Sequence, residues 1–173
     1  MVLLEFNFQY VEVGVMVLYF VIMGMLLFEF RAMKEKINEK LELNNEGMKL
    51  RLQALERLTL FTERTGLQNL IGRIENMQTN AAVLHKSLVE TIRSEYEYNL
   101  TQQIYVSPEV WNAVTKLKDQ NIYIINQLAL HIPPHATAMD LGKRILDYSM
   151  TQNAELNIIV LDALQFEAKK ILE

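Results

Sequence analysis

The sequence predicts an all-α protein with one N-terminal transmembrane helix, a charged helical stalk and a cytoplasmic bundle of about five helices. Residues 13–28 form an apolar run without a single charge. The chain has only Gly 6 and Pro 3, fewer turn residues than strands and hairpins need. Apolar residues recur at helical spacing over much of the rest. The expected divisions are residues 1–30 for the flank and anchor, 31–47 for the stalk and 48–173 for the bundle.

Composition narrows the class of protein. At 173 residues the chain holds one ordinary domain with an appendage. Hydrophobic residues make up 50% and charged residues 22%, which is too apolar for a disordered tail and too charged for a polytopic membrane protein. The net charge of -4 gives no basic footprint for nucleic acid. With Cys 0, disulfides, thiol nucleophiles and thiolate metal sites are excluded.

The N-terminal helix is long enough for a bilayer when aromatic flanks are included. Residues 13–28 span about 24 Å as a helix, short of a hydrocarbon core of about 30 Å. Extending the helix back to Phe8 closes the gap and places Glu12 inside the outer boundary. Aromatic residues flank both ends, as in interfacial belts. Glu12 would either reach headgroup water or pair with a polar group on a partner helix.

Charge asymmetry predicts the orientation of this helix. All 17 basic residues lie after position 30, whereas the N-terminal flank carries Glu5 and Glu12. By the positive-inside rule the N-terminus lies outside and residues 31–173 are cytoplasmic. A cleaved signal peptide would need a basic start and a small-residue cleavage site, which are absent. A buried core helix would need neighbours that cover it on all sides.

The stalk and the bundle follow without strand signals. In residues 31–47, Ile37 and Leu41 give only fragments of a heptad, interrupted by Asn44, so a long coiled coil has weak support. Residues 44–47 are expected to kink or end the helix. Residues 65–68 have capping-box spacing, and Ser107, Thr137 and Asn153 are expected N-caps. Five longer bundle helices are expected at residues 48–65, 80–104, 110–132, 138–150 and 154–173, with a short helix at residues 67–76.

No residue pattern points to catalysis, a cofactor or a metal. His131 and His135 are separated by Ile-Pro-Pro, which cannot present both rings on one helical face. His85 lacks acidic companions at ligand spacing and is interpreted as a surface or boundary residue. Phosphate-binding loops, dinucleotide glycine patterns and nucleophile elbows are absent, so we expect a protein that is not an enzyme.

The most unusual feature is a row of polar residues on the core-facing side of the helix at residues 80–104. Glu95 and Asn99, followed by Gln102 or Gln103, continue the apolar stripe; Gln103 is taken as the third member of the row, and Arg57 is its expected partner. Buried polar groups need hydrogen bonds, so we expect a structural network, with a ligand pocket or docking surface as the alternative. Tyr105 and Trp111 are expected to pack in the bundle, because the surrounding segment has no basic residues for stacking nucleotides.

Two segments carry a resemblance to a known family. They are residues 51–64, RLQALERLTLFTER, and residues 95–107, EYEYNLTQQIYVS, followed by Trp111. Together with the N-terminal anchor they resemble an uncharacterised family of Bacteroidetes membrane proteins, a domain of unknown function. The resemblance covers essentially the whole chain. It implies a small inner-membrane protein with a cytoplasmic helical domain, and it brings no activity or cofactor.

These observations lead to two functional hypotheses. The first is a non-enzymatic accessory or scaffold subunit of an inner-membrane complex, which docks other membrane proteins through residues 95–111. The second is a ligand-sensing module whose polar pocket is lined by Arg57, Glu95, Asn99 and Gln103. The lipid bilayer is the expected partner in both, and the sequence leaves open a homo-oligomer.

Overall fold

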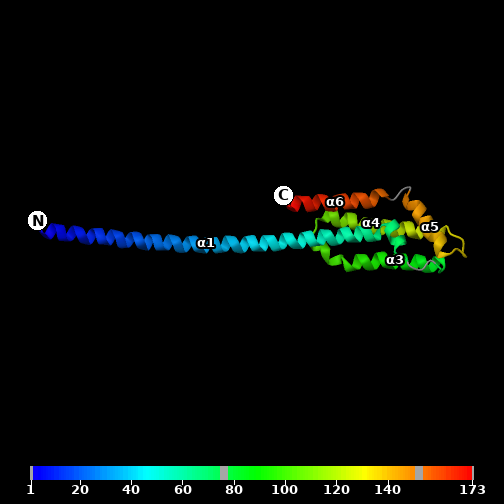
Figure 1. Ribbon diagram of the computed structural model, residues 1–173, viewed down its shortest axis with the longest axis horizontal. Coiled ribbons are helices and arrows are strands. Elements are labelled where there is room, and N and C mark those ends of the chain that lie inside the picture. Colours follow the sequence, from blue (N-terminus) through cyan, green and yellow to red (C-terminus); the bar gives the residue numbers. More distant parts are fainter. Residues whose placement is uncertain (1, 75–77, 151–153, 173) are drawn as a thin grey trace. The chain divides into compact units, whose positions relative to one another are not determined.

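The computed structural model describes residues 2–74, 78–150 and 154–172, and for residues 2–9, 154 and 155 it describes the backbone (Figure 1). Within these ranges the chain is helical and has no strand, which confirms the all-α prediction. The elements are α1 (Val2–Thr65), α2 (Leu67–Gly72), α3 (Ala81–Tyr98), the 3-10 helix η1 (Leu100–Ile104), α4 (Pro108–Leu130), α5 (Ala138–Tyr148) and α6 (Ala154–Leu172).

The chain divides into two compact units, Met1–Gly47 and Met48–Glu173. The first unit is the N-terminal part of α1, and the second holds the rest of α1 with the other helices. Residues 44–47 do not end the helix, contrary to one of the two expectations. A single glycine within a helix costs only about 1 kcal/mol, too little to stop a helix flanked by good helix formers.

In the first unit, the described side chains of residues 10–47 are all exposed. The described chain has one helix that is apolar and long enough to cross a membrane; its apolar window has a mean hydropathy of 2.4 and none of it is buried. A helix that is apolar on all sides needs either protein or lipid around it. Within this unit no other segment supplies that cover.

The second unit has two hydrophobic clusters that share α4. In Figure 1, α3, α4 and α6 lie along the C-terminal part of α1, with α5 near one end. One cluster packs Leu58 and Phe61 of α1 against the first half of α4 and against α6. The other packs α2, α3 and α5 against the second half of α4, around Leu88 and Ile125. The bundle core therefore forms around α4.

The C-terminal end of α1 is closed by side chains from three other parts of the bundle. The last four carbonyl groups of a helix have no partners within it. Here each of them accepts a hydrogen bond from a side chain. Asn157 donates to the Thr62 carbonyl at 3.2 Å, and Asn69 donates to the Glu63 carbonyl at 2.8 Å. Arg73 donates to the Arg64 carbonyl at 2.7 Å, and Asn121 donates to the Thr65 carbonyl at 2.9 Å. These bonds fix where α1 ends relative to α4 and α6.

The N-caps of α4 and α5 are confirmed. Ser107 Oγ accepts from the Val110 amide at 3.3 Å. Thr137 and Asp140 form a full capping box, and these hydrogen bonds to the carboxylate lower the pKa of Asp140. Because the folded pKa is depressed, this contribution to stability is complete above the unfolded pKa of about 4 and is lost as the pH falls through the folded pKa.

Two local expectations are wrong. The residue before α2 is Gly66, which makes no side-chain cap, and Thr65 instead donates its hydroxyl to the Phe61 carbonyl at 2.8 Å. A Cβ at Gly66 would displace the Asn157 amide nitrogen, which donates to the Thr62 carbonyl. The helix expected at residues 80–104 ends at Tyr98 and gives way to η1. The expected cap Asn153 lies outside the described residues.

Asn121 offers a direct test of the α1 cap. Its side chain is fully buried in α4, so Asn121→Ala removes the donor to the Thr65 carbonyl without exposing that carbonyl to water. We expect the free energy of unfolding to fall by about 1–3 kcal/mol. Urea denaturation of the full chain in mild detergent, followed by circular dichroism, measures it. Asn112→Ala, on the exposed side of the same helix, should change it by less than about 0.5 kcal/mol, and equal losses would contradict the assignment.

Candidate functional site

Glu95 is paired with two arginines that are different from the expected one. Its carboxylate lies 3.4 Å from Arg64 in α1 and 4.0 Å from Arg73 after α2. The Arg64 and Arg73 side chains are 53% and 44% exposed, so both pairs are open to solvent screening and contribute modestly to stability. Their geometric effect is to hold α3 against the end of α1.

Arg57, the expected partner of Glu95, instead contacts Tyr98. Its guanidinium lies 4.8 Å from the centroid of the Tyr98 ring and donates to the Tyr98 carbonyl at 3.4 Å. A cation over a tyrosine face is attracted by about 0.5–1 kcal/mol at exposed sites. Arg57 therefore positions an exposed aromatic ring at the C-terminal end of α3.

The remaining members of the polar row separate from one another. Asn99 is buried and donates to the Glu95 carbonyl one turn earlier at 2.8 Å, which closes the end of α3. Gln103 is exposed, and its neighbour Gln102 is the buried one. A continuous α-helix would hold Gln102 and Gln103 both near the apolar stripe, whereas the 3-10 helix after Asn99 buries Gln102 and exposes Gln103.

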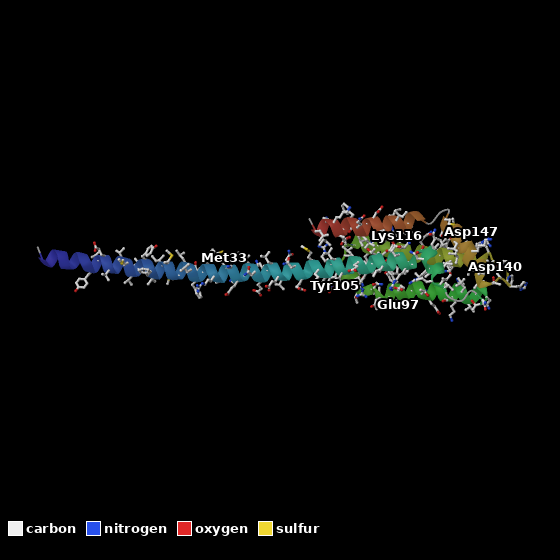
Figure 2. The ribbon with its side chains drawn as sticks, viewed as in Figure 1. Met33, Glu97, Tyr105, Lys116, Asp140 and Asp147 are labelled. Atoms are coloured by element: carbon white, nitrogen blue, oxygen red, sulfur yellow. The ribbon has the colours of Figure 1, made fainter. Side chains whose placement is uncertain are left out.

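The aromatic residues form a packed group between α3 and α4. Trp111 stacks on Tyr96 with centroids 5.3 Å apart, and Lys118 lies over the Tyr96 ring at 4.5 Å. The Tyr96 hydroxyl bonds to Thr115 Oγ1 at 2.9 Å. Tyr105, labelled in Figure 2, is half-buried just after η1. Trp111 is therefore committed to packing and is a poor probe of any docking surface.

Three exposed apolar side chains lie close together in sequence where α3 passes into η1. Tyr98 is 73% exposed and Ile104 is 72% exposed, with Leu100 between them in sequence. We call these three residues the η1 face. Their exposure makes this segment a candidate for contact with another molecule.

A buried carboxylate anchors the start of α4. Glu167 of α6 accepts hydrogen bonds from the Ser107 amide at 2.9 Å and from the Ser107 hydroxyl, and lies 3.7 Å from Arg51 of α1. Its side chain is only 9% exposed. The positive end of the α4 dipole also favours a carboxylate at this position. One side chain thus joins α1, α4 and α6.

Two of the surface cavities in the second unit border residues singled out from the sequence. One of about 470 Å³ borders Glu95 and is lined by Arg64, Ser87, Glu90, Thr91, Ser94 and Tyr98 as well. Arg57, Asn99 and Gln103 are not part of this lining. The other, of about 460 Å³, lies between α3, α4 and the turn that follows α4, where His85 Nε2 and Asn126 Oδ1 are 2.7 Å apart. His85 is half-buried at this boundary.

The other candidate residues lie apart from these features. Glu12 is exposed on the apolar part of α1 in the first unit. His131 Nδ1 bonds to the Gln127 carbonyl at 2.7 Å, which places it at the end of α4. Among the residues with described positions, no group of three His, Asp or Glu side chains gathers as a metal site would require.

Comparison with known protein families gives a match over residues 3–171 to a family of unknown function, DUF7935. The chain belongs to this family. The membership confirms the part of the resemblance that concerns a domain of unknown function over nearly the whole chain. No curated protein and no solved structure matched the chain.

Sequence reasoning missed two residues that organise this unit, although each left a signal. Glu167 interrupts the stripe of Val160, Leu164 and Ile171 on α6. Asn121 interrupts a similar stripe on α4, after Leu117. A polar residue inside an apolar stripe must find a partner when buried. The partners themselves, on distant segments, could not be read from the spacing.

Glu167→Ala tests the contribution of the buried carboxylate. It leaves the Ser107 amide without its acceptor, and hydrogen bonds to charged groups contribute about 1.5–3 kcal/mol, so we expect a loss of that size in the free energy of unfolding. Glu167→Gln keeps one acceptor and should lose less. The exposed Glu97 on α3 (Figure 2) gives the matched control, Glu97→Ala. If urea unfolding shows the same stability for both alanine variants, Glu167 is not an anchor.

Proposed function

We propose that this protein is a non-enzymatic accessory or scaffold subunit of an inner-membrane complex in bacteria. In this proposal α1 crosses the membrane through residues 8–28 with the N-terminus outside. Residues 31–173 lie in the cytoplasm, where the bundle presents a docking surface to other membrane proteins. The observation that carries the proposal is the uncharged run at residues 13–28, in which every residue is exposed.

The orientation is supported by the charges on either side of that run. Arg31 and Lys34 follow it directly, and no basic residue precedes it. Moving basic residues across a bilayer is unfavourable, so the basic side stays in the cytoplasm. A bacterial inner membrane agrees with the resemblance of the chain to Bacteroidetes membrane proteins.

The η1 face is the best candidate for the docking surface. Tyr98 and Ile104 are largely exposed, and Arg57 holds the Tyr98 ring in place. An ordered aromatic residue beside an arginine is a composition that recurs in protein interfaces. The partner would present apolar side chains to Ile104 and a carboxylate to Arg57.

Ligand sensing through the expected polar pocket has less support. Its four residues would have to converge on one cavity, but Arg57 contacts Tyr98, Asn99 bonds to its own helix and Gln103 is exposed. The polar groups of the row are mostly used to hold helices together. Polar groups that hold helices together stabilise a scaffold, and few polar groups of the row remain to bind a ligand.

A photocrosslinking experiment tests the docking surface in the full-length protein within its native membranes. Benzoylphenylalanine at Ile104 should give an adduct with another membrane protein, and the same probe at Tyr123, an exposed tyrosine on α4, should not. Ile104→Ser in a tagged chain should then lose most of that partner on purification, with circular dichroism unchanged. Equal crosslinking at both positions, or no loss with Ile104→Ser, would refute the η1 face.

A further inference from the structure

The part of α1 that follows the apolar run has an apolar stripe with no partner in its own unit. Leu26, Phe30, Met33, Ile37, Leu41 and Asn44 follow one another at spacings of 4, 3, 4, 4 and 3 residues. At 100° per residue they fall within an arc of about 80° on one side of the helix. The five apolar members are all more than half exposed. We call this stripe the stalk seam.

Charged residues are sorted around the stalk seam. The four glutamates at positions 35, 39, 42 and 46 all lie on the opposite side of the helix, within an arc of about 60°. Lys34 and Lys40 lie at the two borders of the seam. A helix that only needed solubility would carry charges on every side, so the sorting indicates that the seam is covered.

The spacing of the seam is that of a long helical coil. Leu26 to Ile37 and Met33 to Asn44 are both steps of 11 residues, and an 11-residue repeat keeps one face in register along nearly straight or slightly right-handed helices. The apolar residues of this segment do not form a continuous heptad pattern, because their spacing is not a 3.5-residue repeat. The long continuous α1 supplies the unbroken helix that such a repeat requires.

Charge complementarity identifies the cover as a second copy of the same segment. Glu29 and Lys34 flank the seam on opposite sides and are five residues apart, which is the spacing that brings them together between two parallel helices. Asn44 falls within the seam, where it meets its own equivalent. A single asparagine in such a seam fixes register and pairing at some cost in stability.

A membrane surface fits the seam less well. Because α1 continues as a helix through residues 29–47, Ile37 and Leu41 lie about 14 Å and 20 Å along the axis beyond Phe28. A helix that leaves the bilayer in this way carries its apolar side chains away from the lipid. Two chains anchored in one membrane with the same orientation are also held parallel, as the pairing of Glu29 with Lys34 requires.

We infer that the stalk of this protein forms a parallel homodimer through the stalk seam, with Glu29 of each chain beside Lys34 of the other. The parallel orientation rests on the proposed membrane anchor, while the pairing of the seam does not require the docking function. The dimer places two copies of the bundle on one stalk, so each assembly presents two η1 faces.

The chain lacks cysteine, so single substitutions report on the seam without background. Full-length Met33→Cys and Leu41→Cys variants in native membranes are treated with copper phenanthroline, and two differently tagged copies are co-expressed. Disulfides need Cα atoms within about 7 Å, so we expect at least about tenfold more disulfide-linked dimer, containing both tags, than with Glu35→Cys or Glu42→Cys on the opposite side.

Maleimide labelling of the same variants measures whether each cysteine is accessible to solvent, so that a lack of crosslinking can also be interpreted. Equal crosslinking on both sides of the helix overturns the seam. Seam cysteines that resist labelling and do not crosslink would show that lipid or another protein covers them, which also overturns the homodimer. Membrane sedimentation of each variant tests the proposed anchor separately from the dimer. A chain that is monomeric but still sediments with membranes would refute the dimer alone.

Discussion

Removing the apolar surface of α1 from water is the constraint on which the rest of the protein depends. Residues 13–28 are uncharged, and their large side chains stand exposed around the helix. Burying one such side chain gains about 1.5–3 kcal/mol, so leaving ten of them in water forgoes more than the entire stability of a typical domain, about 5–15 kcal/mol. A helix satisfies its own backbone hydrogen bonds and can therefore enter lipid alone. In the proposed anchored form, the rest of α1 lies outside the bilayer, and its C-terminal part belongs to the folded bundle.

Within the bundle, polar side chains from distant segments cap the C-terminal end of α1. Asn121, Asn157, Asn69 and Arg73 each bond to one of its last four carbonyls, and Glu167 ties α6 to the start of α4 beside Arg51. The buried polar groups among them hold helices together. This structural role agrees with the proposal that the protein supplies surfaces to partners. The η1 face and the stalk seam are two of the exposed apolar surfaces that remain available for contact.

Features that depend on neighbouring residues were predictable from the sequence. Ser107 and Thr137 cap helices through residues three positions away, and Pro133 with Pro134 blocks helix continuation at the end of α4, so spacing alone identifies them. Features that depend on distant residues were not predictable. Glu95 forms ion pairs with Arg64 and Arg73, and not with Arg57, because the short α2 brings the chain back against α3. The exposure of Gln103 was not predictable, because this residue lies in the 3-10 helix that follows α3, and residue propensities do not fix where α3 ends.

The central claim is that residues 13–28 lie in lipid and hold the bundle on the cytoplasmic side. Protease added to intact spheroplasts that carry the full chain with a C-terminal epitope tests it most directly. The account predicts that the epitope remains in the membrane fraction and protected from cleavage until the spheroplasts are lysed, and is then digested. Cleavage of the epitope in intact spheroplasts, or its recovery in the soluble fraction after gentle lysis, would contradict the account.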